Sequence, residues 1–125
     1  MKSEIKDLYG FDYDSFKAVD YPLEKYIPKQ PNNFSFWLSI EVGISGKEGA
    51  DLFEVFVCTP QWFLSHTLQE KIMVGLHCII VAEYNYQTLR NKLEELFCIE
   101  GASWFDIAKK LSYYGRWENQ VELGL

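Results

Sequence analysis

The side chains best suited to chemistry in this sequence are its cysteines and its two histidines, His66 and His77. His77 and Cys78 are adjacent on an expected strand, so their side chains point to opposite faces and cannot share a metal ion. His66 and Cys58 could approach one another, but no carboxylate or second cysteine stands at the spacing of a zinc ligand set. We therefore predict no metal site and interpret both histidines as hydrogen-bonded structural residues.

A thiol-dependent active site would need a thiolate in an electropositive pocket. Cys58 precedes an expected helix, whose N-terminus favours a thiolate, but it ends an apolar strand without basic neighbours in sequence. None of the three cysteines, Cys58, Cys78 and Cys98, forms a Cys-x-x-Cys pair, and one is left over in any pairing. We interpret all three as reduced thiols of a cytoplasmic protein. A small thiol enzyme using Cys58 or Cys78 is the third of three functional hypotheses.

Other catalytic patterns are missing from the sequence. Glu94 and Glu95 are adjacent in an expected helix, where neighbours diverge by about 100° and do not face each other. The segment 43–46 lacks the lysine and the following helix of a phosphate-binding loop, and no dinucleotide fingerprint occurs. We accordingly predict no catalytic residue and no cofactor.

Charge and aromatic content favour protein binding instead. The net charge is −6, which argues against nucleic acid and against an anionic membrane surface as partners. No segment reaches the ~18 apolar residues of a membrane span, and the N-terminus lacks the apolar core of a signal peptide. Aromatic residues make up 17% of the chain, so some rings should lie on the surface as binding anchors. An acidic surface suits a basic partner, although the same charge would also serve solubility alone.

The elements that must carry such a surface fall into a strand-rich N-terminal half and a helix-rich C-terminal half of one domain, residues 1–125. Alternating apolar residues predict strands over 34–44 and 51–58, joined by a glycine turn at 43–49, and a first strand over 4–9. The predicted fold class is α+β, with a mainly antiparallel sheet and about three helices packed on one face.

Helix signals follow in the second half of the chain. A short helix is predicted to begin at Pro60 with Thr59 as its cap, and a longer one to span 86–97 with Asn85 as its cap. A third is predicted to run from a capping-box-like start at Ser103 to near Gly115. A buried strand is expected over 76–83, where apolar residues form a continuous run.

The segment 10–33 is long for a loop of a compact domain, and long loops often carry function. We expect it to wrap the surface, with a short helix over 14–18. Its acidic and aromatic side chains form a first candidate binding surface, and the predicted hairpin supplies a second. The first comprises Asp12, Tyr13, Asp14, Asp20 and Tyr21, and the second comprises Glu48, Asp51 and Glu54.

Several short motifs occur in a fixed order along most of the chain. They are the aromatic strand 34–43 that ends in glycine, Phe56-Val57-Cys58-Thr59-Pro60 with Trp62, Gly75-Leu76-His77 followed by 79–81 and Tyr84, and Trp104, Ile107, Ala108 and Leu111 before Gly115-Arg116-Trp117-Glu118. In this order and spacing, the sequence resembles the Immunity protein 8 family of bacterial polymorphic toxin systems. Ile44 departs from the pattern, because family members often have proline after the glycine.

The resemblance implies an α+β fold and a cytoplasmic, non-enzymatic protein that binds a cognate toxin domain and occludes it. An adaptor or subunit of another protein complex is the alternative hypothesis, and the oligomeric state stays open. Capping and packing explain the signature residues, so we assign them to the fold and not to the toxin contact. These residues are Thr59, Pro60, Trp62, Gly75, Trp104, Gly115 and Trp117.

Overall fold

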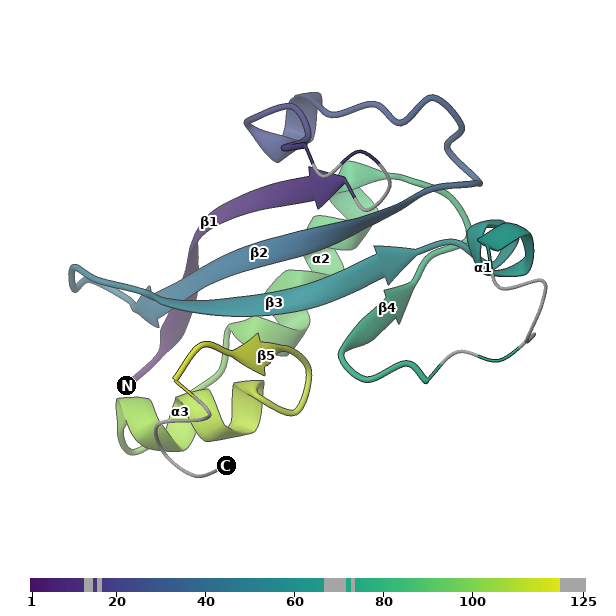
Figure 1. The fold of residues 1–125 in the computed structure, drawn as a ribbon. Helices are drawn as coiled ribbons and strands as arrows, with labels where there is room; N and C mark the ends of the chain where they lie inside the picture. Colours follow the sequence, from purple (N-terminus) through teal and green to yellow (C-terminus); the bar gives the residue numbers. More distant parts are fainter. Residues whose placement is uncertain (13–14, 16, 67–71, 73, 120–125) are drawn as a thin grey trace.

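The computed structural model describes residues 1–12, 15, 17–66, 72 and 74–119, and its centre is a twisted sheet (Figure 1). The strands are β1 (Ser3–Asp12), β2 (Ser35–Ile44), β3 (Asp51–Cys58), β4 (Cys78–Ile80) and β5 (Arg116–Trp117). The helices are α1 (Pro60–His66), α2 (Tyr86–Phe97) and α3 (Trp104–Leu111), with a 3-10 turn, η1 (Leu23–Lys25), between β1 and β2.

The sheet is mainly antiparallel, and its strand order is β1-β2-β3-β4. β3 is antiparallel to β2 along its full length, as the predicted hairpin requires. The other edge of β3 is shared, because β4 pairs with it in parallel near Cys58 and β5 pairs with it in antiparallel fashion near Phe53. The predicted α+β class is therefore confirmed.

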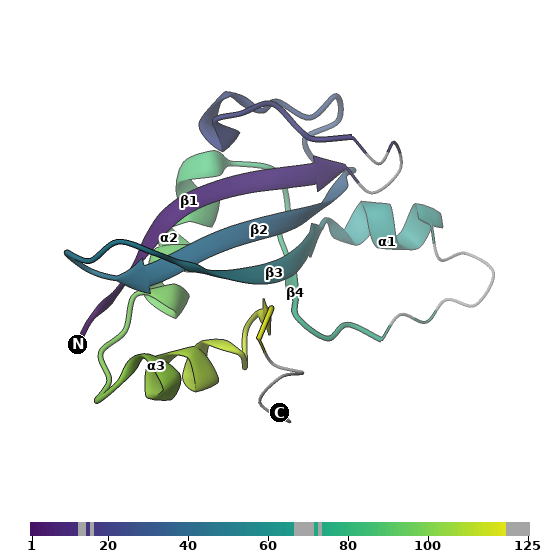
Figure 2. The same cartoon turned by 60° about the vertical axis from the view of Figure 1, so that its left-hand side comes forward.

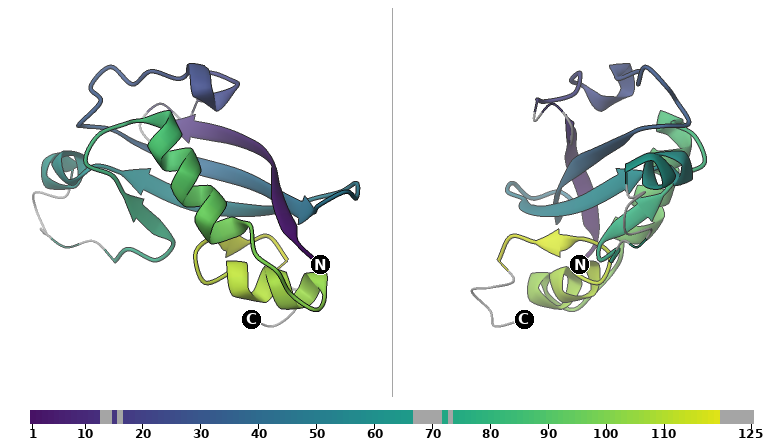
Figure 3. Two further views of the ribbon diagram at one scale, coloured as in Figure 1. Left: turned by 180° about the vertical axis from the view of Figure 1, so that it is seen from behind. Right: turned by 45° about the vertical axis from the view of Figure 1, so that its right-hand side comes forward.

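One face of the sheet is covered by helix α2, which crosses the strands diagonally when the molecule is seen from behind (Figure 3). α3 runs below the sheet and leads through a short turn into β5 (Figure 2). Strand alternation directs the apolar side chains of β2 and β3 toward this side, where they form a fully buried core with α2 and α3. The core members from the two strands are Phe36, Leu38, Ile40, Val42, Phe53, Val55 and Val57.

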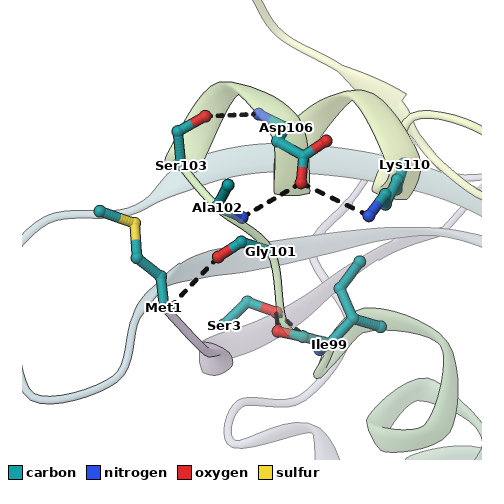
Figure 4. Close-up of polar contacts among 8 residues, drawn as sticks. All are labelled: Met1, Ser3, Ile99, Gly101, Ala102, Ser103, Asp106 and Lys110. Atoms are coloured by element: carbon teal, nitrogen blue, oxygen red, sulfur yellow. Dashed lines mark hydrogen bonds and ion pairs between the residues drawn. The ribbon is translucent and has the colours of Figure 1, made fainter.

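The loop between α2 and α3 is fixed to the start of β1 (Figure 4). The Ser3 hydroxyl donates to the Phe97 carbonyl at 2.7 Å and accepts from the Ile99 amide at 2.9 Å. The N-terminal ammonium of Met1 donates to the Gly101 carbonyl at 3.1 Å. Ser3 is fully buried, so its two bonds satisfy polar groups that water does not reach.

Each helix begins at a side chain that accepts a backbone N–H of its first turn, as predicted. The acceptors are Thr59, Asn85 and Ser103, at 3.0 to 3.2 Å. In α3 the carboxylate of Asp106 also accepts from the Ala102 amide at 3.2 Å, which completes a variant of the capping box (Figure 4). The bounds of α2 match the predicted range of 86–97.

The prediction of a buried strand over 76–83 is wrong. Only Cys78–Ile80 pair with β3, and Leu76 and Ile80 are 75% and 63% exposed. His77 has a φ of 55°, which turns the chain immediately before β4 and prevents the strand from starting earlier. The apolar run therefore lies along the edge of the sheet and not in its centre.

Three further features differ from the sequence-based expectations. β1 is longer than the predicted 4–9, since it continues to Asp12. The predicted helix over 14–18 falls partly outside the described residues, and Ala18 forms a β-bridge with Phe11 instead. β5 was not expected, because a two-residue strand leaves no periodic pattern in a sequence.

Candidate functional site

The face of the sheet turned away from α2 carries one aromatic ring from each of three neighbouring strands. Phe11 pairs directly with Trp37, and Trp37 pairs with Phe56. The ring centroids of Trp37 and Phe56 are 5.0 Å apart. Phe11 and Trp37 are 42% and 37% exposed, whereas Phe56 is buried because Trp62 of α1 packs against it at 5.4 Å. Trp37 thus packs on a buried aromatic pair, and Phe11 is its exposed neighbour on the next strand.

This surface faces the viewer in Figure 1, and in the described part of the chain no helix covers it except α1 at one end. We call it the open sheet face. By strand register and alternation it comprises Asp7, Tyr9, Phe11, Trp37, Glu41 and Glu54.

Acidic side chains occupy the end of the open sheet face that lies away from the rings. Asp7 is directly opposite Glu41, and Glu54 lies in the next row, opposite Ser39. Burial raises the pKa of the Tyr9 phenol, and the neighbouring carboxylates of Glu41, Asp7 and Glu54 raise it further. Because like charges directly opposite each other destabilise a sheet, this arrangement carries a cost in the free protein.

Few cations offset these carboxylates. Among the ion pairs within the described residues, none includes Asp7, Glu41 or Glu54. Arg116 of β5 is opposite Glu54 in the sheet and is the nearest cation by register. The open sheet face is thus aromatic at one end and acidic at the other, a combination that fits a basic protein surface.

The structure joins one residue of the predicted loop surface to this face. The Tyr21 hydroxyl lies 3.1 Å from both carboxylate oxygens of Asp7, and this hydrogen bond raises the pKa of Tyr21. Asp20 is exposed nearby in sequence, and Asp12 ends β1, where its carboxylate accepts from the Ser15 amide at 3.0 Å. The other two candidates, Tyr13 and Asp14, lie outside the described residues.

The hairpin candidates do not form one patch. Glu48 is exposed in the turn between β2 and β3, and Glu54 lies on the open sheet face.

Sequence reasoning missed Asp7, Glu41 and Trp37 as binding candidates. The alternation along 34–44 gives a signal for two of them, because it already places Trp37 and Glu41 on the face opposite the apolar residues.

Asp51, the remaining hairpin candidate, links three parts of the chain through hydrogen bonds. Its Oδ2 accepts from the indole N–H groups of Trp104 and Trp117 at 2.8 and 2.9 Å, and from the Asn119 amide at 3.2 Å. One carboxylate oxygen therefore ties the hairpin to α3, to β5 and to the residues that follow it.

Several of the signature residues take part in packing and hydrogen bonding. Trp62 and Trp117 are buried, and the buried Thr59 hydroxyl accepts from two backbone amides. Gly115 packs so closely that an added Cβ would lie 3.2 Å from both Phe97 and Val55. Gly75 is exposed, so packing does not explain it.

The thiol and imidazole groups make hydrogen bonds within the fold. Cys58 is fully buried, and its Sγ lies 4.0 Å from Cys78 Sγ; this contact and burial raise the pKa of Cys58 well above its ordinary value. His66 Nδ1 lies 3.0 Å from the Trp62 carbonyl, and His77 Nε2 lies 2.9 Å from the Ser112 carbonyl. Both histidines are therefore hydrogen-bonded to the backbone, as their interpretation requires.

Among the described residues, no three or more His, Cys, Asp or Glu side chains are grouped so that they could hold a metal ion. The helices found there are also too short or too polar to traverse a bilayer.

Comparison with known proteins identifies the family. The family model described as Immunity protein 8 matches residues 12–121. No curated protein and no solved structure matched the chain. The matched segment includes β2, β3, all three helices and every signature residue. The chain therefore belongs to the Immunity protein 8 family.

Proposed function

We propose that this immunity protein neutralises a cognate toxin domain of a polymorphic toxin system by binding it through the open sheet face and covering its functional surface. The observation that carries the proposal is a sheet face with the exposed rings of Phe11 and Trp37 at one end and the directly opposed carboxylates of Asp7 and Glu41 at the other. Such an arrangement lowers the stability of the free protein. A basic partner would turn this cost into a favourable interaction on binding.

Inhibition by occlusion requires no catalytic group. A stable complex buries roughly 800 Å² on each partner, with aromatic anchors near its centre and polar groups around them. Phe11 and Trp37 would supply the anchors, and the acidic rows would face the charges of the toxin. The partner surface that fits is basic around an apolar centre, as in a cleft that binds nucleic acid. We expect the complex to form in the cytoplasm of the producing cell.

The test is co-expression with the toxin domain encoded next to the gene, followed by isolation of the complex and a growth assay for protection. Asp7→Lys and Glu41→Lys reverse charge at the centre of the acidic rows and should abolish both complex and protection. Glu95→Lys is the matched control, because Glu95 is an exposed carboxylate of α2 on the opposite side of the sheet. It should behave as the unmodified protein does.

Two further variants separate the open sheet face from the surfaces predicted from sequence. Asp20→Lys alters the loop, and Glu48→Lys alters the hairpin turn. If either of these abolishes the complex while Asp7→Lys and Glu41→Lys leave it intact, the interface lies on those segments and our proposal is wrong. A complex with a different cellular protein and none with the toxin would favour an adaptor function.

A further inference from the structure

Two of the three thiols meet where β3 and β4 pair. Cys58 ends β3, Cys78 begins β4, and their Sγ atoms are 4.0 Å apart. The third thiol, Cys98, follows α2 and donates instead to the carboxylate of Glu94 at 2.9 Å. The chain thus contains one close pair of thiols and one separate thiol that serves as an internal control.

We infer that Cys58 and Cys78 form a reversible dithiol–disulfide site, which a small-molecule disulfide oxidises and which covalently joins β3 to β4. This inference concerns a modification site and does not rest on the proposed toxin contact.

The geometry allows the bond after a small shift of β4. Cys78 pairs with Phe56, and Cys58 pairs with Ile80, so the two cysteines are diagonal neighbours across the strands. An S–S bond is about 2 Å long, so the sulfurs must approach by about 2 Å. β4 pairs over three residues only, and no described strand lies on its far side. Because the ladder between β4 and β3 is short, a local shift of β4 would disturb few backbone hydrogen bonds.

The reaction needs one accessible, reactive thiol to attack first and a second thiol to resolve the mixed disulfide, and the two cysteines differ in this way. Contact with the Cys58 thiol lowers the pKa of Cys78, against the opposing effect of burial. Cys78 is half-buried and packs beside Phe56 and Trp62, so it is the more accessible of the two thiols. Cys58 is fully buried. Cys78 is thus the attacking thiol, and Cys58 is the resolving thiol.

The reaction has two balanced steps. The Cys78 thiolate attacks one sulfur of the small disulfide RSSR, forms a mixed disulfide and releases one thiolate, RS⁻. Cys58 then gives up its proton, and its sulfur attacks Cys78 Sγ and displaces the second RS⁻. The protein loses two hydrogen atoms, and RSSR is reduced to two RSH. Because β4 must move to bring the sulfurs together, we expect the disulfide to be strained. Strained disulfides are readily reduced, so an excess of RSH should reverse the reaction.

The experiment equilibrates the full-length protein with oxidised and reduced glutathione and measures its intact mass. Oxidation should remove about 2 Da, leave one alkylatable thiol, and give a cross-linked Cys58–Cys78 peptide after digestion without reductant. Cys98→Ala should lose the same mass. Cys58→Ala should stop at the mixed disulfide on Cys78, and Cys78→Ala should stay reduced.

A second readout is the alkylation rate of the reduced protein near pH 7. Burial and the Glu94 carboxylate raise the pKa of Cys98 to about 11, so Cys78 should react at least about tenfold faster than Cys98. Equal rates would contradict the assigned reactivity. A mixed disulfide that persists in the unmodified protein, or a mass loss that persists in Cys78→Ala, would overturn the inference.

Discussion

Glu41→Gln should stabilise the free protein, because it removes one member of the like-charge pair on the open sheet face. The substitution keeps the shape of the side chain and leaves Asp7 in place. Glu41 is directly opposite Asp7 on β1 and opposite Leu52 on β3, so it faces no cation across either strand. Neutralising it removes a repulsion without removing an ion pair described in the structure.

The size of the effect follows from the separation of the strands. Directly opposite side chains in a sheet interact by roughly 0.2–1 kcal/mol. Glu54 is a diagonal neighbour of Glu41 and adds a weaker repulsion over about 7–8 Å. We expect the free energy of unfolding to rise by about 0.5–1 kcal/mol at low ionic strength. With a denaturant slope of roughly 1.5 kcal/mol/M, the midpoint in urea should rise by about 0.3–0.7 M.

The assay is urea denaturation at low and at high salt, with Glu95→Gln as the control. Glu95→Gln removes the same formal charge, but Glu95 is paired with Lys92 at 3.0 Å, so no gain is expected from it. The gain from Glu41→Gln should shrink at about 1 M salt, where the screening length is about 3 Å. A loss of stability, or a gain of equal size in both variants, would refute the reasoning that the open sheet face is destabilised by its own charge.

Three other predictions concern the fold. Asp51→Ala removes the acceptor of three side-chain donors and should cost about 2–4 kcal/mol in urea denaturation, whereas Glu48→Ala should stay within about 0.5 kcal/mol. Burial raises the pKa of Tyr26 and of Tyr84 to about 12, above the ordinary value of 10.0. Their contribution to stability should therefore be complete below pH 10.0 and be lost as pH rises toward 12, measured by tyrosinate absorbance and unfolding. Gly115→Ala should cost about 1–3 kcal/mol, because its Cβ would crowd the core.

The parts of the fold that could be predicted from sequence are those fixed by local patterns. Alternation over 34–44 and 51–58 gave β2 and β3, because a strand buried on one face repeats every two residues. The caps at Asn85 and Ser103 gave the start of α2 and of α3, because each satisfies an amide three residues later.

The strand over 76–83 was misjudged because burial depends on neighbours that are distant in sequence. Its apolar run is typical of a central strand, yet among the strands of the described residues β4 pairs with β3 alone. The turn at His77 adds a local constraint that residue type does not indicate, since positive φ is uncommon outside glycine.

The candidate surface could be predicted in chemical character but not in position. Net charge and aromatic content indicated an acidic surface with exposed rings. The pairing of Asp7 with Glu41 depends on the register of β1, which shifts at an irregularity between Ile5 and Asp7. A slip by one residue would send these side chains to the other face, so composition alone does not locate them. Asp51 illustrates the same limit, because its donors lie 53 to 68 residues away.

The most direct test of the central claim is the association rate of the toxin domain with the unmodified protein and with Glu41→Lys, measured at low and at high ionic strength. If the open sheet face attracts a basic partner, association should slow as salt rises, and Glu41→Lys should slow it by at least about tenfold at low salt. Glu95→Lys should leave the rate unchanged. Equal association rates for Glu41→Lys and the unmodified protein at low salt would contradict the account.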